Sequence, residues 1–259
     1  MLYLVDAFTD VPFKGNPAGV CILDEYPSDI ELQKIAAYYN WSEISFLKKI
    51  DESTFRIRWF SPLDEAPLCG HATLAAAHIL FSKGIVKGKS IEFLYNSGTL
   101  YANLNKDKTV TMSFPEKPVE TCDKVDFSVQ ELIGISDFIE VLRDDLLFVI
   151  VLKNADDIKN ASPNFDAIKK IKTRAIAITA RGSGDFDFFS RYFAPIVGLY
   201  EDPVCGSMHC RLANYWKTKL DKTEFIAYQA SKRSGVLKLT VDSGVVKISG
   251  NAVTVCTIY

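Results

Sequence analysis

The chain has 259 residues, a formal net charge of −2 and 48% hydrophobic residues. This length suits one large domain or two domains of about 100–150 residues each. The near-zero charge argues against a nucleic-acid partner, because no block of Lys and Arg is present to replace counterions along a phosphate backbone.

Other broad classes of protein are also disfavoured. No stretch approaches the roughly 20 apolar residues of a membrane span, so we expect no membrane partner. The first residues lack the basic start and long apolar run of a secretory signal peptide. Six cysteines are scattered through a chain with enough apolar residues for a core, which favours a reduced, cytoplasmic protein over a disulfide framework.

The sequence predicts neither a metal nor a cofactor. It contains three histidines and no Cys-x-x-Cys pair, so the count of typical zinc ligands is low. It also shows no glycine-rich dinucleotide loop, P-loop or lysine-centred cofactor motif.

The first half of the chain alternates helical and strand patterns. The predicted helix over 72–80 is rich in alanine and almost entirely apolar, as is typical of a buried helix. The later strands alternate apolar and polar residues, as antiparallel strands do when one face is in water. The predicted elements are a helix over 29–39, a strand over 55–62, the helix over 72–80, and strands over 91–95, 100–104 and 110–114.

The second half repeats this order of elements, and such internal repetition indicates a duplicated architecture. Pro115 and Pro118 interrupt the pattern between the two copies. The predicted elements of the second copy are a helix over 166–171, a strand over 188–195, a helix from 208 to 216, and strands over 224–228, 236–241 and 245–248.

We therefore expect an α+β fold of two pseudo-symmetric halves, each a curved, mostly antiparallel sheet or barrel around one central helix. The halves span 1–118 and 119–251. A final strand over 252–259 could join the first half.

Both central helices are predicted to begin at a Cys-Gly-polar triplet, Cys69-Gly70-His71 and Cys205-Gly206-Ser207. A helix N-terminus presents unpaired N–H groups and about half a positive charge, so it can bind a carboxylate or a developing enolate. The same setting can lower the pKa of a cysteine thiol. Two facing thiols would suit a racemase, whereas each cysteine alone could equally be a small buried hydrophobic residue.

Glu43 opens the apolar run Ile44–Leu47, where an unpaired carboxylate would be costly. Such surroundings would raise the pKa of Glu43 and let it carry a proton near neutral pH. The alternative is an edge-strand glutamate that points to water or caps a turn.

Two further polar residues have open interpretations. His71 could carry a proton, anchor a substrate, or be a first-turn histidine whose hydrogen bonds are satisfied by the protein. Asp202, just before Pro203, could hold a substrate polar group, steer His71, or cap a turn.

Taken together, these residues resemble the phenazine-biosynthesis isomerase (PhzF-like) family of the diaminopimelate epimerase-like superfamily. The resemblance covers nearly the whole chain. Its motifs are Asp6-Ala7-Phe8-Thr9, Gly15-Asn16-Pro17-Ala18-Gly19-Val20, Ser42-Glu43, Arg58-Trp59-Phe60-Ser61-Pro62, Leu68-Cys69-Gly70-His71-Ala72-Thr73 and Glu201-Asp202-Pro203-Val204-Cys205-Gly206-Ser207.

The resemblance implies two pseudo-symmetric halves with the active site in the cleft between them, and a homodimer. It implies that Glu43 is the acid/base that moves a proton between carbons, accompanied by His71 and Asp202. It also implies that a small carboxylate substrate is bound by Asn16, Gly70, Gly206 and Ser207.

One departure leaves the reaction open. The well-known isomerases of the family carry threonine where this chain has Cys205, whereas diaminopimelate epimerase and proline racemase carry cysteine at both helix starts. The first hypothesis is a cofactor-independent isomerase driven by Glu43. The alternatives are an amino-acid racemase or epimerase that uses Cys69 and Cys205, and a non-catalytic protein that binds a small anion.

Overall fold

The computed structural model describes residues 1–258. Close contacts divide the chain into two units. The first unit comprises Met1–Ser113 and the described residues from Lys247 onward, and the second comprises Phe114–Val246. Across residues 1–258, none of the helices combines the length and the apolar character that a bilayer crossing requires.

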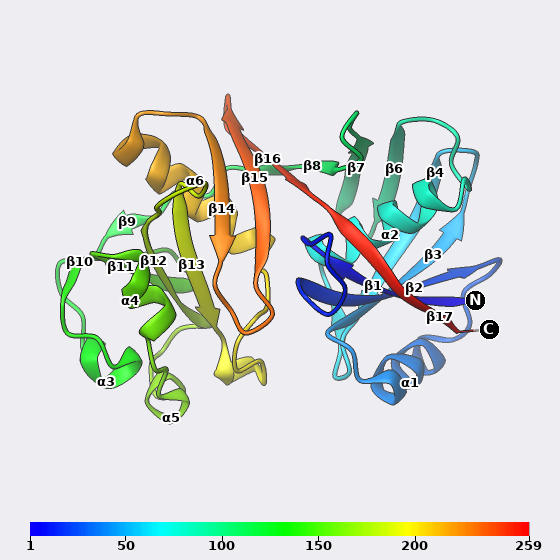
Figure 1. The fold of residues 1–259 in the computed structure, drawn as a ribbon. Helices are drawn as coiled ribbons and strands as arrows, with labels where there is room; N and C mark the ends of the chain where they lie inside the picture. The colour runs from blue at the N-terminus through cyan, green and yellow to red at the C-terminus, as the bar shows by residue number, and fades with distance from the viewer. Residues whose placement is uncertain (259) are drawn as a thin grey trace. The chain divides into compact units, whose positions relative to one another are not determined.

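The first unit is a mostly antiparallel sheet with two helices (Figure 1). Antiparallel pairing joins β17 to β1, β1 to β2, β3 to β4, β6 to β7 and β7 to β8, whereas β2 pairs in parallel with β3 and β4 with β6. Its elements are β1 (Leu2–Ala7), β2 (Asn16–Leu23), α1 (Asp29–Tyr39), β3 (Glu43–Lys49), β4 (Thr54–Phe60), β5 (Glu65–Ala66), α2 (Gly70–Ser82), β6 (Ser90–Tyr95), β7 (Gly98–Leu104), β8 (Val110–Pro115, which runs into the second unit) and β17 (Ala252–Ile258).

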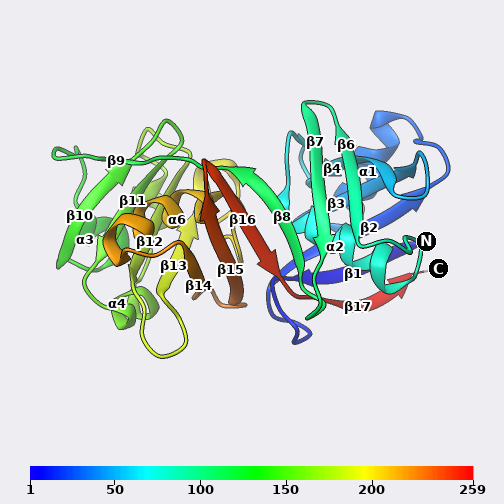
Figure 2. The ribbon, with the colours of Figure 1, turned by 90° about the horizontal axis from the view of Figure 1, so that it is seen from above.

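Helix α2 is the central helix of the first unit. It contacts strands β1, β2, β3, β7 and β17, and Figure 2 shows it enclosed by the strands of this sheet. All residues from His71 to Ala77 are buried, which explains the nearly all-apolar sequence of this segment. Helix α1 packs on the outside, and its start is fixed by a capping box between Ser28 and Glu31.

The second unit is also a mostly antiparallel sheet. Antiparallel pairing joins β9 to β10, β10 to β11, β12 to β13 and β14 to β15, whereas β11 pairs in parallel with β12 and β13 with β14. Its elements are β9 (Glu120–Thr121), α3 (Val129–Ile133), β10 (Phe138–Arg143), β11 (Leu147–Leu152), α4 (Ala155–Asn160), α5 (Phe165–Ile168), β12 (Ala175–Arg181), β13 (Phe188–Phe193), η1 (Pro195–Val197), α6 (Gly206–Leu220), β14 (Glu224–Gln229), β15 (Gly235–Asp242) and β16 (Val245–Gly250, which runs into the first unit).

The two units repeat one pattern of strand pairing. The series β1, β2, β3, β4, β6, β7 has the same sequence of antiparallel and parallel neighbours as β10, β11, β12, β13, β14, β15. Helix α2 lies between β4 and β6 in the chain, and α6 lies between β13 and β14. The expected α+β fold with an internal repeat is confirmed.

Several predicted element boundaries were wrong. The strand predicted over 188–195 ends at Phe193, because Pro195 cannot donate to a ladder and instead opens a 3-10 helix. The strand over 55–62 likewise ends at Phe60, before Pro62. The helix predicted over 166–171 is a single turn, α5. The second unit also contains α3, α4 and strands β10–β12, which the sequence did not predict.

Candidate functional site

Both central helices begin at the predicted triplets, with Cys69 as the N-cap of α2 and Cys205 as the N-cap of α6. Each N-cap carbonyl accepts a hydrogen bond from the side chain four residues later. Thr73 Oγ1 donates to the carbonyl oxygen of Cys69 at 2.6 Å, and His209 Nδ1 donates to that of Cys205 at 2.7 Å. Both side chains are buried, so the backbone at each helix start is fixed by a hydrogen bond shielded from water.

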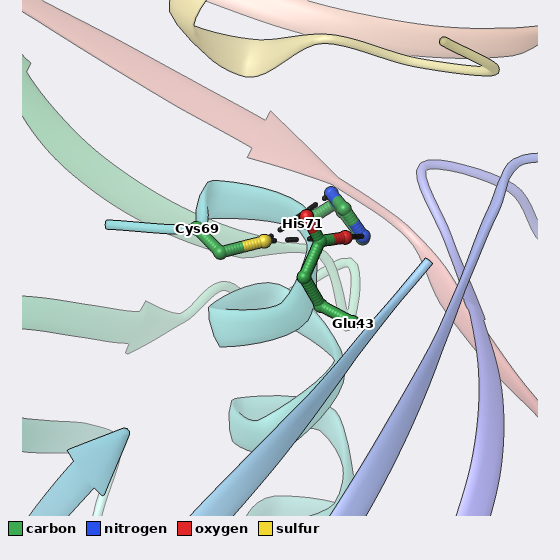
Figure 3. Close-up of side chains that lie close together, drawn as sticks. All are labelled: Glu43, Cys69 and His71. Carbon is green, nitrogen blue, oxygen red and sulfur yellow. Dashed lines mark hydrogen bonds and ion pairs between the residues drawn. The ribbon is translucent and has the colours of Figure 1, made fainter. Parts of the chain in front are cut away.

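Glu43, Cys69 and His71 form a cluster in the first unit (Figure 3). Glu43 Oε2 lies 3.1 Å from His71 Nε2, and Cys69 Sγ lies 3.5 Å from His71 Nδ1 and 3.9 Å from Nε2. The side chain of Glu43 is 22% exposed and that of His71 is 10% exposed. The cluster is therefore mostly desolvated but open to solvent on the glutamate side.

The fold brings the three side chains together through a strand and a helix. Glu43 is the first residue of β3, whereas Cys69 and His71 belong to the start of α2. Ser45 Oγ, two residues along β3, donates to the carbonyl oxygen of Ala72 at 2.8 Å. This buried bond fixes the register between strand and helix and so positions Glu43 against His71.

The proton of the pair resides on the histidine. Burial alone would raise the pKa of Glu43, but the charge of His71 and hydrogen bonds from His71, Ser42 and Cys69 outweigh burial, and the pKa of Glu43 lies below its ordinary value. Burial alone would lower the pKa of His71, but its interactions with Cys69 and with the carboxylate of Glu43, including a hydrogen bond to each, outweigh burial, and the pKa of His71 lies well above 6.5. The expected raised pKa of Glu43 is therefore wrong, because the sequence does not show that the neighbouring histidine carries a positive charge.

The helix starts do not lower the pKa values of the two thiols, although such a lowering was one of the two interpretations left open by the sequence. Burial is the largest effect at Cys69, where the charge of Glu43 adds to it, and the pKa of Cys69 is raised. At Cys205, burial and the charge of Asp202 raise the pKa well above its ordinary value. Both thiols are therefore protonated near neutral pH, because desolvation and a neighbouring carboxylate outweigh the helix N-terminus.

Asn16 lies next to this cluster in the same sheet. It opens β2, which pairs in parallel with β3, and it is completely buried. Ser42 Oγ, on the residue before Glu43, donates to Asn16 Oδ1 at 3.4 Å. Asn16 thus contacts the segment that carries Glu43.

The second unit holds Asp202, Cys205, Gly206 and Ser207 at the start of α6. Gln229 on β14 fixes the loop before this helix, because its Oε1 accepts from the N–H of Cys205 at 2.8 Å and its Nε2 donates to the carbonyl oxygen of Asp202 at 2.6 Å. The structure therefore places Asp202 and Cys205 side by side, with Ser207 on the first turn of the helix.

A buried ion pair lies one turn further along α6. Arg211 is 1% exposed. Its Nε donates a hydrogen bond to Asp144 Oδ2 at 2.6 Å, and its Nη1 donates one to the carbonyl oxygen of Ser207 at 3.0 Å. This guanidinium links the helix start to the turn between β10 and β11.

Four residues that support the site were not predicted from the sequence: Ser45, Thr73, Gln229 and Arg211. Arg211 did carry a signal, because it is a single charge between the apolar residues Cys210 and Leu212 and stands four residues after Ser207, where a helix brings side chains onto one face. The other three supports carry no such signal, since polar residues of their kind are common in strands and helices.

Comparison with known proteins gives consistent matches over the whole chain. The family model described as "Phenazine biosynthesis-like protein" matches residues 5–257. A protein of Halalkalibacterium halodurans named as an uncharacterized isomerase is 41% identical, over 98% of this chain and 96% of its own length.

Solved structures show the same architecture. A phenazine biosynthesis protein of the PhzF family from Enterococcus faecalis superposes with a TM-score of 0.93 at 35% identity, covering 98% of this chain and 96% of that one. A probable proline racemase from Agrobacterium radiobacter, at 9% identity, shares the fold with a TM-score of 0.63 and covers 98% of this chain and 90% of that one.

Proposed function

Because the chain belongs to the phenazine biosynthesis-like protein family, we propose that it is a cofactor-independent isomerase acting on a small carboxylate-bearing metabolite. The reaction moves a proton from one carbon atom of the substrate to another. The observation that carries this proposal is the contact between Glu43 Oε2 and His71 Nε2 at 3.1 Å. It supplies an ionised base in a mostly desolvated position beside the start of α2.

Glu43 begins the cycle as a carboxylate. It removes a proton from an acidified carbon of the substrate and becomes a carboxylic acid, while the negative charge left on the substrate spreads toward its own carboxyl group. Glu43 then returns the proton to a second carbon and is a carboxylate again, so no net proton is gained or lost. A single group that takes and gives back a proton is sufficient for an isomerisation.

The imidazolium of His71 keeps Glu43 ionised at rest. As Glu43 accepts the substrate proton, its attraction to His71 weakens, and the imidazolium becomes available as a hydrogen-bond donor to the developing negative charge. The N–H groups near Gly70 stabilise the same charge, because a helix N-terminus favours anions. On the family resemblance, Asp202 stays a predicted catalytic residue, and Asn16, Gly206 and Ser207 stay predicted substrate-binding residues.

A second candidate function is a racemase or epimerase that uses Cys69 and Cys205. It is favoured by the presence of a cysteine at the N-cap of both central helices. The raised pKa values of both thiols weigh against it, because a protonated thiol is a poor base.

Hydrogen exchange tests the proposal and does not require an identified substrate. The protein is incubated in D₂O with mixtures of cyclic and unsaturated carboxylic acids and of amino acids, and mass spectrometry detects carbon-bound deuterium. An isomerase incorporates deuterium into an unsaturated or cyclic acid together with a shifted isomer. Deuterium uptake confined to the α-carbon of an amino acid would support the racemase, and no uptake at all would support a binding protein.

A further inference from the structure

We propose that Glu43, Cys69 and His71 form a preorganised inhibitory site for a thiophilic divalent metal ion, of which Zn²⁺ is the best match. Within residues 1–258 they are the one group of three potential ligands whose donor atoms all lie within 4.8 Å of one another. The metal is an inhibitor in this proposal and plays no part in the reaction of the isomerase.

The distances between the donor atoms fit a tetrahedral zinc ion. Zinc bonds of about 2.0–2.1 Å to nitrogen, 2.0–2.2 Å to oxygen and 2.3 Å to sulfur place neighbouring ligand atoms about 3.3–3.6 Å apart. In the structure, His71 Nε2 lies 3.1 Å from Glu43 Oε2 and 3.9 Å from Cys69 Sγ. The third pair, the Glu43 carboxylate and Cys69 Sγ, lies within 4.8 Å, so rotation of these side chains would bring the three donors into coordination range.

The backbone that carries the ligands is already fixed. Cys69 is the N-cap of α2, and its carbonyl accepts the short bond from Thr73. Glu43 on β3 is locked to the same helix by the bond from Ser45 to the carbonyl of Ala72. The site therefore requires little ordering of the protein, and this favours affinity.

The donor set selects the metal. A thiolate and an imidazole prefer zinc and related ions, whereas Mg²⁺ and Ca²⁺ prefer sites made of oxygen ligands. Three protein ligands with one side open to solvent, here the side of Glu43, match the arrangement in which zinc retains a water molecule at its fourth position. Binding displaces the thiol proton of Cys69 and the proton held between His71 and Glu43, and both protons pass to solvent.

The second unit provides an internal comparison. Cys205 occupies the same N-cap position on α6 and has Asp202 beside it, but Ser207 stands where the first helix start has His71. A serine hydroxyl is a much weaker zinc ligand than an imidazole. Cys205 is therefore a matched control thiol for Cys69.

The consequence for turnover rests on the proposed function. A metal ion bound to Glu43 takes the electron pair that would accept the substrate proton, so zinc stops hydrogen exchange. Metal binding itself requires no substrate, which means that a failure of the metal site and a failure of the proposed function are separately visible.

Cobalt spectroscopy and zinc competition test the site directly. The purified protein is treated with EDTA, desalted into a phosphine reductant and titrated with Co²⁺, which gives a near-ultraviolet charge-transfer band when a thiolate is coordinated. Zinc affinity is measured by competition with a chromophoric chelator. We expect one cobalt ion per chain with a thiolate band, and displacement of cobalt by zinc.

Three variants decide the assignment, each checked for folding by circular dichroism. Cys69→Ser should lose the thiolate band and bind zinc at least about tenfold more weakly. Glu43→Gln should keep the band but also bind at least about tenfold more weakly, whereas Cys205→Ser should match the wild type. The proposal is overturned if the wild type shows no thiolate band, if the band survives in Cys69→Ser, if it disappears in Cys205→Ser, or if Glu43→Gln binds zinc as tightly as the wild type.

Discussion

His71 Nε2 lies 3.1 Å from Glu43 Oε2, and the opposite directions of their pKa shifts describe one resting state, an imidazolium beside a carboxylate. The pKa of Glu43 is low because the effects of its neighbours, His71 above all, exceed the effect of burial. If the histidine is removed, burial should become the largest effect on Glu43, and its pKa should then lie above the ordinary value instead of below it.

His71→Asn should move the acid limb of activity to higher pH. In the wild type, activity that depends on ionised Glu43 is lost only below the ordinary glutamate pKa of about 4.3, and it is lost on the alkaline side as His71 deprotonates above about 6.5. In the variant, the acid limb should lie above pH 4.3. The pH profile of deuterium incorporation measures this, with His78→Asn, a change on the same helix, as control. An acid limb that stays in place would show that His71 does not set the charge state of Glu43.

Glu43→Gln should reduce turnover by about 10²–10⁴, because it keeps the shape of the side chain and removes the group that titrates. The measurement is the rate of deuterium incorporation into the substrate found in the exchange screen. Glu52→Gln, at an exposed position, serves as the matched control and should retain full activity. A Glu43→Gln enzyme with near-normal turnover would remove Glu43 from the mechanism.

Cys69→Ser and Cys205→Ser should each retain turnover within about tenfold of the wild type. Both thiols are protonated near neutral pH because of burial and a nearby carboxylate, so neither is poised to remove a proton. Rates are compared in the same exchange assay. Activity abolished in either serine variant but preserved in Glu43→Gln would transfer the mechanism to the two thiols.

Asp144→Asn should lower the free energy of unfolding by about 3–5 kcal/mol, because it leaves the buried guanidinium of Arg211 without its counter-charge. Asp137→Asn is the matched control. Its salt bridge with Lys153 joins two side chains that are at least half exposed, and its loss should change the free energy by no more than about 1 kcal/mol. Urea unfolding curves give both values, and equal effects would contradict the buried ion pair.

His209 should make the fold sensitive to acid. Burial lowers its pKa from 6.5 to about 4, so the unfolded chain binds a proton that the folded chain does not bind until lower pH. The contribution of neutral His209 to the free energy of unfolding is fully present above pH 6.5 and declines as the pH falls toward 4. Since one pH unit in this window corresponds to about 1.4 kcal/mol, the total loss is about 3 kcal/mol.

The role of His209 is tested by comparing how steeply the free energy of unfolding falls with pH in the wild type and in His209→Gln. Whatever its stability at neutral pH, the His209→Gln variant should show a smaller decline in the free energy of unfolding between pH 6.5 and 4 than the wild type. Urea midpoints measured at several pH values give the two slopes. Identical slopes would show that His209 does not titrate in this way.

The sequence predicted the central helix of the first unit because its pattern is strong. A nearly all-apolar segment after Cys69-Gly70 has one interpretation, a buried helix with its N-terminus at the glycine. The strands β11 and β12 were missed for the opposite reason. Leu147–Leu152 is a continuous apolar run, and Ala175–Ala180 is apolar except for Thr179. Nearly every residue of both segments is buried, and such runs show neither the alternation of a strand nor the period of a helix.

The sequence predicted which residues form the cluster, but it did not predict the directions of their pKa shifts. The resemblance implies that His71 and Asp202 accompany Glu43, and the structure places His71 beside it. The directions of the pKa shifts depend on which of several opposing effects is larger, and those effects depend on distances that the sequence does not contain. The sequence argument against a zinc site counted histidines and paired cysteines, and it did not consider a glutamate that β3 brings to the start of α2.

The strand β17 has a consequence for the order in which the protein can be assembled. It pairs with β1 in a register that joins Leu2 to Ile258, and Figure 1 shows the two strands side by side. During synthesis, β1 therefore leaves the ribosome long before its partner exists, and its free edge is exposed to other chains until β17 is made. The second unit is continuous in sequence and can fold earlier, so the unit that begins first is the one that is finished last.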